Sequence, residues 1–216
     1  MPPTSSMTTE EIWRAVAVER ASLAELLRDL PDGAWEHASL CADWAVRDVV
    51  AHLILSARPT VGAILLGLLR ARGDLHRMIR DTAIRHAARR TNEQLLAEFS
   101  AGIELRVAAL GTTPADRLMD VLVHGQDIAV PLGVAHPLPD AAGRAALDRV
   151  WELDDQFGAR TGFAGYRLVT DDDAWQVGAG ATIRGTAEAL LLLVSGRAVE
   201  PGRLTGAGAE SWRARS

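Results

Sequence analysis

The chain has 216 residues, of which 48% are hydrophobic, and it carries a formal net charge of −5. This length and apolar content predict one sizeable domain, alone or with a small second unit, and charges spread without a basic stripe exclude a nucleic-acid partner. Lysine is absent, which excludes a Schiff-base lysine, a phosphate-loop lysine and a Ser–Lys dyad.

Helix signals dominate the first 160 residues. The N-terminus has no signal-peptide pattern, and a capping box at Thr8–Glu11 predicts a helix that ends before Pro31. A second capping box begins at Thr91, and Pro114 fits the first turn of another long helix. Pro59 and Gly73 predict breaks between helices. The expected helices cover residues 8–30, 46–59, 60–72, 74–90, 91–110, 114–133 and 139–160, with a loop at 35–44.

The apolar runs and the cysteine bear on location. The longest apolar run, Thr60–Leu69, has about half the length that a membrane span needs. The single cysteine, Cys41, cannot form an internal disulfide, which suits a reducing cytoplasm. We interpret Cys41 as a small buried filler rather than as an activated nucleophile. We therefore expect a soluble, cytoplasmic protein without a membrane partner.

The hydrophobic period changes after residue 160. Alternating runs at Gly162–Thr170 and Ala174–Val177, joined by three aspartates, predict a β-hairpin. A third short strand is expected at Ala181–Arg184, and Thr186 is placed to cap the apolar helix 187–195. The remaining residues are rich in glycine and predict no particular element.

This change of period predicts a helical bundle over residues 1–160 and a small α/β domain over residues 161–216. The hairpin and its helix are too small to hold a core alone. We therefore expect the second domain to dock on the bundle through the apolar run Ala189–Val194.

Three residues on two of the expected helices form a candidate metal site. His52 stands in an apolar helical segment, where a buried imidazole needs partners for both nitrogens. Asp120 and His124 lie four residues apart, which places them on one helix face with Asp127 a turn further on. Facing helices of a bundle build metal sites in this way, and three protein ligands leave a position open. The same spacing is also compatible with a simple Asp–His hydrogen bond.

Longer motifs resemble a known family. The segment Trp35–His52, with Cys41, Asp43-Trp44 and the run that leads to His52, resembles the N-terminal signature of the mycothiol-dependent maleylpyruvate isomerase family. A second signature of that family is an acidic residue, three intervening residues and then His-x-x-Asp, which Asp120 and His124–Asp127 match. The C-terminal part of the family resembles Tyr166–Arg197, so the resemblance spans nearly the whole chain.

The resemblance implies a DinB-like four-helix bundle, mainly α, followed by a small α/β C-terminal domain. It implies a divalent metal, usually zinc, held by His52, Asp120 and His124, with mycothiol as a thiol cofactor at the open position. Nickel, iron and manganese also suit two histidines and a carboxylate. The isomerases carry Glu where this chain has Asp120, so geometry or metal preference can differ. We expect Asp127 to orient His124 or a nearby arginine rather than to bind the ion.

The family also uses an arginine about thirty residues after the first histidine, and Arg80 fits that place best as a catalytic clamp on a substrate carboxylate. A solvated helix face explains the same arginine equally well. The other histidines outside the site, His37, His76, His86 and His136, are expected at the surface. Trp35 and Trp44 are expected to anchor their loop on the bundle.

The leading hypothesis is a mycothiol-dependent metalloenzyme, an isomerase or thiol transferase that acts on a small electrophilic metabolite or xenobiotic. The alternative is a non-catalytic bundle that binds metal or a small ligand in a stress or regulatory role. The expected partners are the small-molecule substrate and the thiol cofactor, with the chain as a monomer or homodimer.

Overall fold

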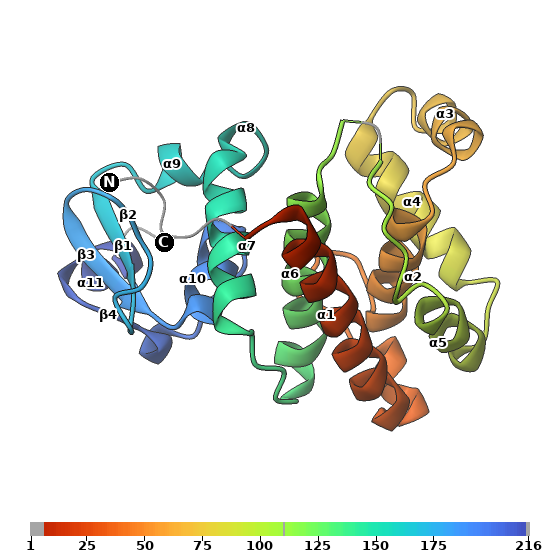
Figure 1. Ribbon diagram of the computed structural model, residues 1–216, viewed down its shortest axis with the longest axis horizontal. Helices are drawn as coiled ribbons and strands as arrows, with labels where there is room; N and C mark the ends of the chain where they lie inside the picture. The colour runs from red at the N-terminus through yellow and green to blue at the C-terminus, as the bar shows by residue number, and fades with distance from the viewer. Residues whose placement is uncertain (1–6, 110, 215–216) are drawn as a thin grey trace. The chain divides into compact units, whose positions relative to one another are not determined.

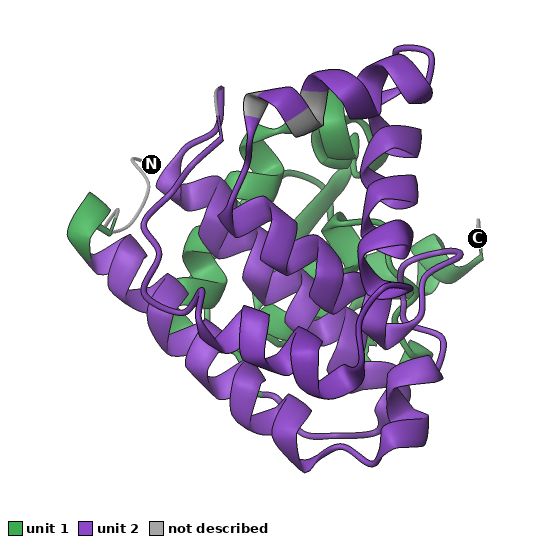
Figure 2. Cartoon of the chain, turned by 90° about the vertical axis from the view of Figure 1, so that its right-hand side faces the viewer, with its two compact units in different colours: residues 1–10, 137–216 green, residues 11–136 purple. Residues whose placement is uncertain are grey.

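The computed structural model describes residues 7–109 and 111–214, apart from the side chains of residues 61, 63 and 64. The chain divides into two compact units, residues 11–136 and residues 137–216 with residues 1–10, which Figure 2 colours separately. The first unit is helical, and the second combines helices with a small sheet. The expected fold class, mainly α with a small α/β C-terminal part, is therefore confirmed.

The first unit is built around helix α2, which packs against helices on several sides (Figure 1). Apolar residues of α1, α2, α4, α5 and α6 form one buried core, together with Trp35 and Trp44 from the intervening loop. The expected anchoring of both tryptophans on the bundle is confirmed. The elements of this unit are α1 (Thr9–Asp29), a 3-10 turn (Asp32–Glu36), α2 (Val46–Ala57), α3 (Val61–Arg70), α4 (Leu75–Ala87), α5 (Asn92–Ser100) and α6 (Pro114–Leu132).

Local capping explains where the helices of this unit begin. Thr91 and Thr113 each accept a hydrogen bond from the third helical residue, and that residue's side chain returns a bond to the capping backbone. Pro114 occupies the first turn of α6, where its missing N–H costs no hydrogen bond. Gly133 ends α6 in the left-handed conformation, with φ of 66°.

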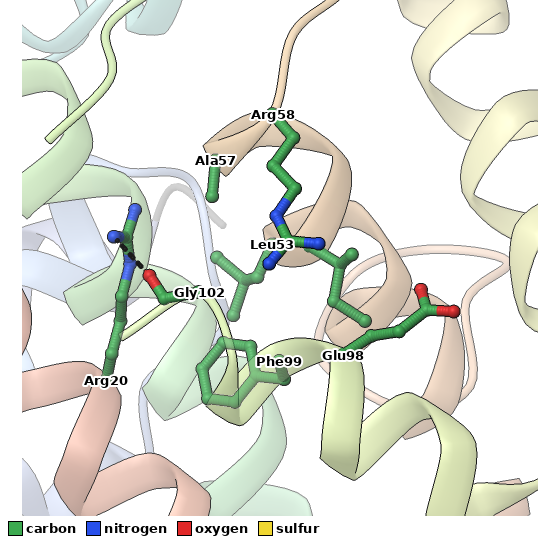
Figure 3. A pocket seen from close by; sticks show the side chains of 8 residues that line it. Arg20, Leu53, Ala57, Arg58, Glu98, Phe99 and Gly102 are labelled. Atoms are coloured by element: carbon green, nitrogen blue, oxygen red, sulfur yellow. Dashed lines mark hydrogen bonds between the residues drawn. The ribbon is translucent and has the colours of Figure 1, made fainter. Parts of the chain in front are cut away.

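Helix α5 is shorter than expected, because it ends at Ser100 rather than near residue 110. The buried guanidinium of Arg20 on α1 explains this end: its Nη1 donates to the carbonyl oxygens of Gly102 at 3.0 Å and of Leu105 at 2.8 Å. Figure 3 shows the bond between Arg20 and Gly102. These carbonyls point at the cation instead of continuing the helix ladder, so a contact across the unit overrides the local helix signal.

The second unit contains a mixed four-stranded sheet in the order β2-β1-β3-β4. The hairpin of β1 and β2 is antiparallel as expected, β3 runs parallel to β1, and the short β4 pairs antiparallel with β3. Thr186 caps the helix that follows β3, also as expected. The strands are β1 (Tyr166–Thr170), β2 (Gln176–Gly178), β3 (Ala181–Gly185) and β4 (Leu204–Thr205); the helices are α7 (Asp140–Glu152), α8 (Asp154–Phe157), α9 (Ala159–Gly162), α10 (Ala187–Val194) and α11 (Ala207–Arg213), with a 3-10 turn at Pro201–Arg203.

The single helix expected over residues 139–160 is broken into α7, α8 and α9. Asp154 explains the break, because its Oδ1 accepts from the backbone N–H of Arg160 at 2.6 Å and of Thr161 at 3.3 Å. Gly158 completes the turn in the left-handed conformation, with φ of 65°. A side chain that bonds nearby backbone N–H groups thus competes with the helix ladder.

The apolar run of α10 is buried within its own unit. All residues from Ala189 to Val194 are buried, and α10 packs on α7 and on the sheet. Because α7 belongs to this unit, the second unit holds a larger core than the expected hairpin and helix alone. The domain boundary after residue 160 and the docking of the domains stay predictions.

Candidate metal centre

His52, Asp120 and His124 converge, as the sequence predicted. His52 comes from α2, whereas Asp120 and His124 come from successive turns of α6. Asp120 Oδ1 lies 3.2 Å from His52 Nε2 and 3.5 Å from His124 Nε2. The three side chains are 13–15% exposed, so they are mostly shielded from water without being sealed from it.

The flanking sequence explains why these polar side chains are held so firmly. Ala51 and Leu53 on either side of His52 are buried, and so are Val121 and Leu122 between Asp120 and His124. Each polar residue therefore sits on a helix whose rotation is fixed by apolar neighbours in the core. The ligand positions are set by packing before any ligand binds.

The second oxygen of Asp120 has its own partners. The Ser56 hydroxyl donates to Asp120 Oδ2 at 3.0 Å, and Arg117 Nη1 lies 3.5 Å from the same oxygen. Burial opposes ionisation of Asp120, but the charges of His52, His124 and Arg117 and the His52 hydrogen bond outweigh it and hold the pKa of Asp120 well below its usual range. Asp120 is therefore an anion whose Oδ1 faces both histidines.

Asp127 contacts His124 from its other side, and its expected orienting role stays a prediction. Asp127 is fully buried, and its Oδ2 lies 2.8 Å from His124 Nδ1. When His124 is neutral, as a metal ligand must be, this bond favours the tautomer that carries hydrogen on Nδ1 and has its lone pair on Nε2, toward Asp120. Burial lowers the pKa of His124, but bonds to Asp127 and Cys41 and the nearby carboxylates raise it to about 10 without a metal.

Cys41 makes polar contacts that a residue filling space in a core would not make. Its Sγ lies 3.0 Å from Asp127 Oδ2, to which it donates, and 3.6 Å from His124 Nδ1. Asp43, with φ of 64°, makes the tight turn that follows. The indole of Trp44 then lies beside both histidines, with ring centroids 5.3 Å from His52 and 6.1 Å from His124.

The donor set fits a single divalent ion. Ligand atoms bound tetrahedrally to zinc at about 2.0–2.1 Å lie about 3.3 Å from one another. The two Asp120 distances, 3.2 and 3.5 Å, match that spacing, and all three ligand atoms lie within 4.8 Å. Cys41, His124 and Asp127 form a second possible group, but Asp127 is fully buried and its Oδ2 already accepts from Cys41 Sγ at 3.0 Å and lies 2.8 Å from His124 Nδ1. The first group is therefore the better candidate for an ion site.

Arg80 lies in α4 and is not in contact with the three ligands. Its guanidinium binds Asp81 Oδ1 at 3.1 Å, and its Nη1 lies 4.0 Å from Asp43 in the loop that carries Trp44. The side chain is 44% exposed, and its catalytic role stays a prediction.

The surface expectation is right for two of the other four histidines, His37 and His76, and wrong for two. His86 Nε2 pairs with Glu98 at 2.8 Å, with 15% of the histidine side chain exposed. His136 is buried and pairs with the buried Glu19 at 2.6 Å. This pair lies against Gly125, where an added Cβ would stand 3.1 Å from His136 Nε2 and 3.2 Å from Glu19 Oε1.

The hollow beside Arg20 offers no ligand site. The hollow between Arg20, Leu53 and Phe99 is filled by side chains and leaves no space for a water molecule (Figure 3). Among the described residues, no helix combines the length and the apolar character that crossing a membrane requires.

Comparisons with known proteins bear on the fold and on the family of the chain. No curated protein sequence matches the chain. The crystal structure of the mycothiol-dependent maleylpyruvate isomerase superposes with a TM-score of 0.66 at 14% identity, covering 94% of each chain. The H52A mutant of that enzyme superposes with a TM-score of 0.64 at 13% identity, again over 94% of each chain. These likenesses establish a shared fold.

The sequence comparison goes further than the fold. The family described as the mycothiol maleylpyruvate isomerase N-terminal domain matches residues 16–129, the stretch that holds all three candidate ligands. This match covers more than half of the chain and supports a mycothiol-related enzyme. The chain belongs to the mycothiol maleylpyruvate isomerase N-terminal domain family.

Proposed function

We propose that the chain is a mycothiol-dependent metalloenzyme, an isomerase or thiol transferase that acts on a small electrophilic compound. The observation that carries this proposal is the convergence of His52 Nε2, Asp120 Oδ1 and His124 Nε2, in which both distances to Asp120 match the spacing of zinc ligands. Three ligands leave room for an exogenous group, as catalytic rather than structural sites do.

The residues around the ligands fit this role. Ser56 and Arg117 hold one oxygen of Asp120, so that the other faces the two histidines. Asp127 keeps the proton of His124 on Nδ1 and thereby leaves Nε2 available. A divalent ion in this place would lower the pKa of a thiol, so that the nucleophilic thiolate is available at neutral pH.

Arg80 is the proposed substrate clamp. Its exposed guanidinium pairs with Asp81 and lies near Asp43, two residues after Cys41. A planar guanidinium binds a carboxylate through two parallel hydrogen bonds, which would orient an anionic electrophile. Zinc is our first choice for the metal, and nickel, iron and manganese suit the same donors.

The test combines metal analysis with a thiol titration. Protein purified without added metal or chelator should carry close to one divalent ion per chain, and His52→Ala, Asp120→Ala or His124→Ala should each remove most of it. When cobalt replaces the native ion, mycothiol should produce a saturable thiolate-to-cobalt absorption band. The exposed His76→Ala provides the matched control and should keep both properties.

The outcomes separate the two candidate functions. Full metal occupancy in His124→Ala contradicts the ligand assignment. Bound metal without any spectral response to mycothiol favours a non-catalytic metal-binding bundle and overturns the enzyme proposal.

A further inference from the structure

Buried hydrogen-bond donors without a partner lie in side chains around the candidate metal centre. Among the described residues, the buried side-chain nitrogens without a hydrogen-bond partner are Trp44 Nε1, Arg47 Nε and Arg117 Nε. Two of these belong to side chains that touch the three ligands, because Trp44 lies beside both histidines and Arg117 pairs with Asp120. A buried donor without a partner is costly, so such a group in a folded protein calls for an explanation.

The indole nitrogen is the one polar group of Trp44 that is left over. The backbone N–H of Trp44 donates to the Cys41 carbonyl at 3.2 Å, and its carbonyl accepts from the backbone and the hydroxyl of Ser39, each at 2.9 Å. Only 9% of the residue is exposed, so bulk water does not replace the missing partner. The loop therefore holds the ring in place while its N–H stays unused.

The chemistry of an indole restricts what the missing partner can be. The N–H of tryptophan only donates, so its partner is an acceptor. A divalent ion held by His52, Asp120 and His124 would attract an anionic group of an incoming ligand. That anionic group would then be the acceptor next to Trp44. Arg117 is less available for this role, because its guanidinium already binds Asp120 and the Ser56 carbonyl.

We propose that Trp44 Nε1 donates a hydrogen bond to the anionic group, a thiolate or a carboxylate, of a ligand bound at the His52–Asp120–His124 cluster. This inference rests on the proposed function, because it requires an ion held by those three residues. It makes Trp44 a ligand-contacting residue in addition to an anchor of its loop.

The variant Trp44→Phe tests the proposal, because phenylalanine keeps an aromatic ring beside the histidines and removes the donor. The cobalt-loaded full chain is titrated with 2-mercaptoethanol as a thiolate source and, separately, with acetate as a carboxylate, and absorption reports binding. We expect about tenfold weaker binding of the anion that Trp44 recognises, since bonds to charged groups are the stronger ones. Trp175→Phe is the matched control, because that buried indole donates to Asp148 at 2.8 Å in the other unit.

A measurement on the unmodified chain covers the case in which Trp44→Phe fails to fold. Of the six indole N–H signals in a nitrogen-15 spectrum, cobalt should broaden that of Trp44 most strongly. In the zinc-loaded protein, this signal should move with saturation as the recognised anion is added.

Each result supports or overturns the proposal. A weakened response to 2-mercaptoethanol alone assigns the contact to the thiolate, and a weakened response to acetate alone assigns it to a carboxylate. Unchanged affinity for both anions, or a Trp44 signal that does not move at saturation, overturns the proposal while the metal site stands. Absence of metal from the wild-type chain overturns the proposed function, and this inference with it.

Discussion

Helices α6 and α10 both have many buried residues, but the types of side chain that they bury differ. Every buried residue of α10 is apolar, namely Ala189 and the run from Leu190 to Val194. Helix α6 buries Asp116, Gln126 and Asp127 among its apolar residues, and it also carries Asp120 and His124 with little exposure. Apolar burial stabilises a fold directly, whereas buried polar groups cost free energy unless partners compensate them.

The comparison shows where to look for function in this chain. Both helices begin with a threonine cap, so their local helix signals are alike. Of the two helices, only α6 places polar side chains that need partners at positions with little exposure. These partners include His52, Ser56 and Cys41 from elsewhere in the chain. Under the proposed function, α10 serves stability and α6 carries the candidate site, so mutations in the two helices should have different effects.

The largest effect on stability is expected from Leu191→Ala in α10. Leu191 is 1% exposed, and truncating a buried leucine removes apolar contacts and leaves a cavity, at a cost of about 2–5 kcal/mol. Urea unfolding followed by circular dichroism measures this loss. The same truncation at Leu69, which is 77% exposed, should cost almost nothing. Metal content per folded chain should be unchanged in both variants, and a loss of metal in Leu191→Ala would break the division of roles.

A smaller effect, confined to the metal, is expected from Asp127→Asn in α6. The amide keeps an oxygen that can accept from His124 Nδ1 but removes the charge that strengthens the histidine as a ligand, so metal affinity should fall about 10–100-fold. Competition with a chromophoric chelator measures the affinity. Asp148→Asn, which changes the carboxylate that accepts from Trp175, is the matched control. Equal affinities in Asp127→Asn and wild type would show that the buried carboxylate is structural only.

The smallest effect is expected from Glu98→Gln, a polar contact of the bundle away from the ligands. Burial raises the pKa of Glu98, but Arg90 at 2.5 Å and His86 at 2.8 Å outweigh it and lower the pKa below 4.5. A depressed folded-state pKa contributes stability above the unfolded pKa, and this contribution disappears as pH falls through the folded value.

Because Glu98 is 31% exposed, the contribution at neutral pH should be only about 0.5–1 kcal/mol. Wild type should therefore exceed Glu98→Gln in stability at pH 7, and the gap should shrink as pH falls below about 4.5. Urea midpoints at several pH values provide the measurement. A gap that grows on acidification would contradict the assigned direction of the pKa shift.

Much of the fold could be predicted because its signals are local. Thr91, Thr113 and Thr186 cap helices within three residues of themselves, and Gly133 ends α6 through its own backbone conformation. The end of α5 could not be predicted, because it depends on Arg20, which lies 82 residues before Gly102. His136 was misplaced for a similar reason, since its partner Glu19 is 117 residues away.

The candidate site was predictable to the extent that it follows helical spacing. Asp120 and His124 lie four residues apart, and the same reasoning could have found Ser56, four residues after His52, and Arg117, three before Asp120. The contact of Cys41 with Asp127 had no such signal, because Cys41 lies in a loop that is tied to α6 by the bond from the Leu40 N–H to the Asp127 carbonyl, 87 residues further along the chain.

The glycine after His124 limits how this protein could be redesigned. A Cβ at Gly125 would stand 3.2 Å from Glu19 Oε1 and 3.1 Å from His136 Nε2, so this buried pair would have to shift to admit even alanine. A library intended to change ligand preference would therefore disturb the Glu19–His136 pair at position 125. The exposed turn positions 42 and 43 are a better place for variation, because the flanking Cys41 and Trp44 keep this turn beside the same histidines. An engineer would keep α6 as the fixed frame and diversify the turn that faces it.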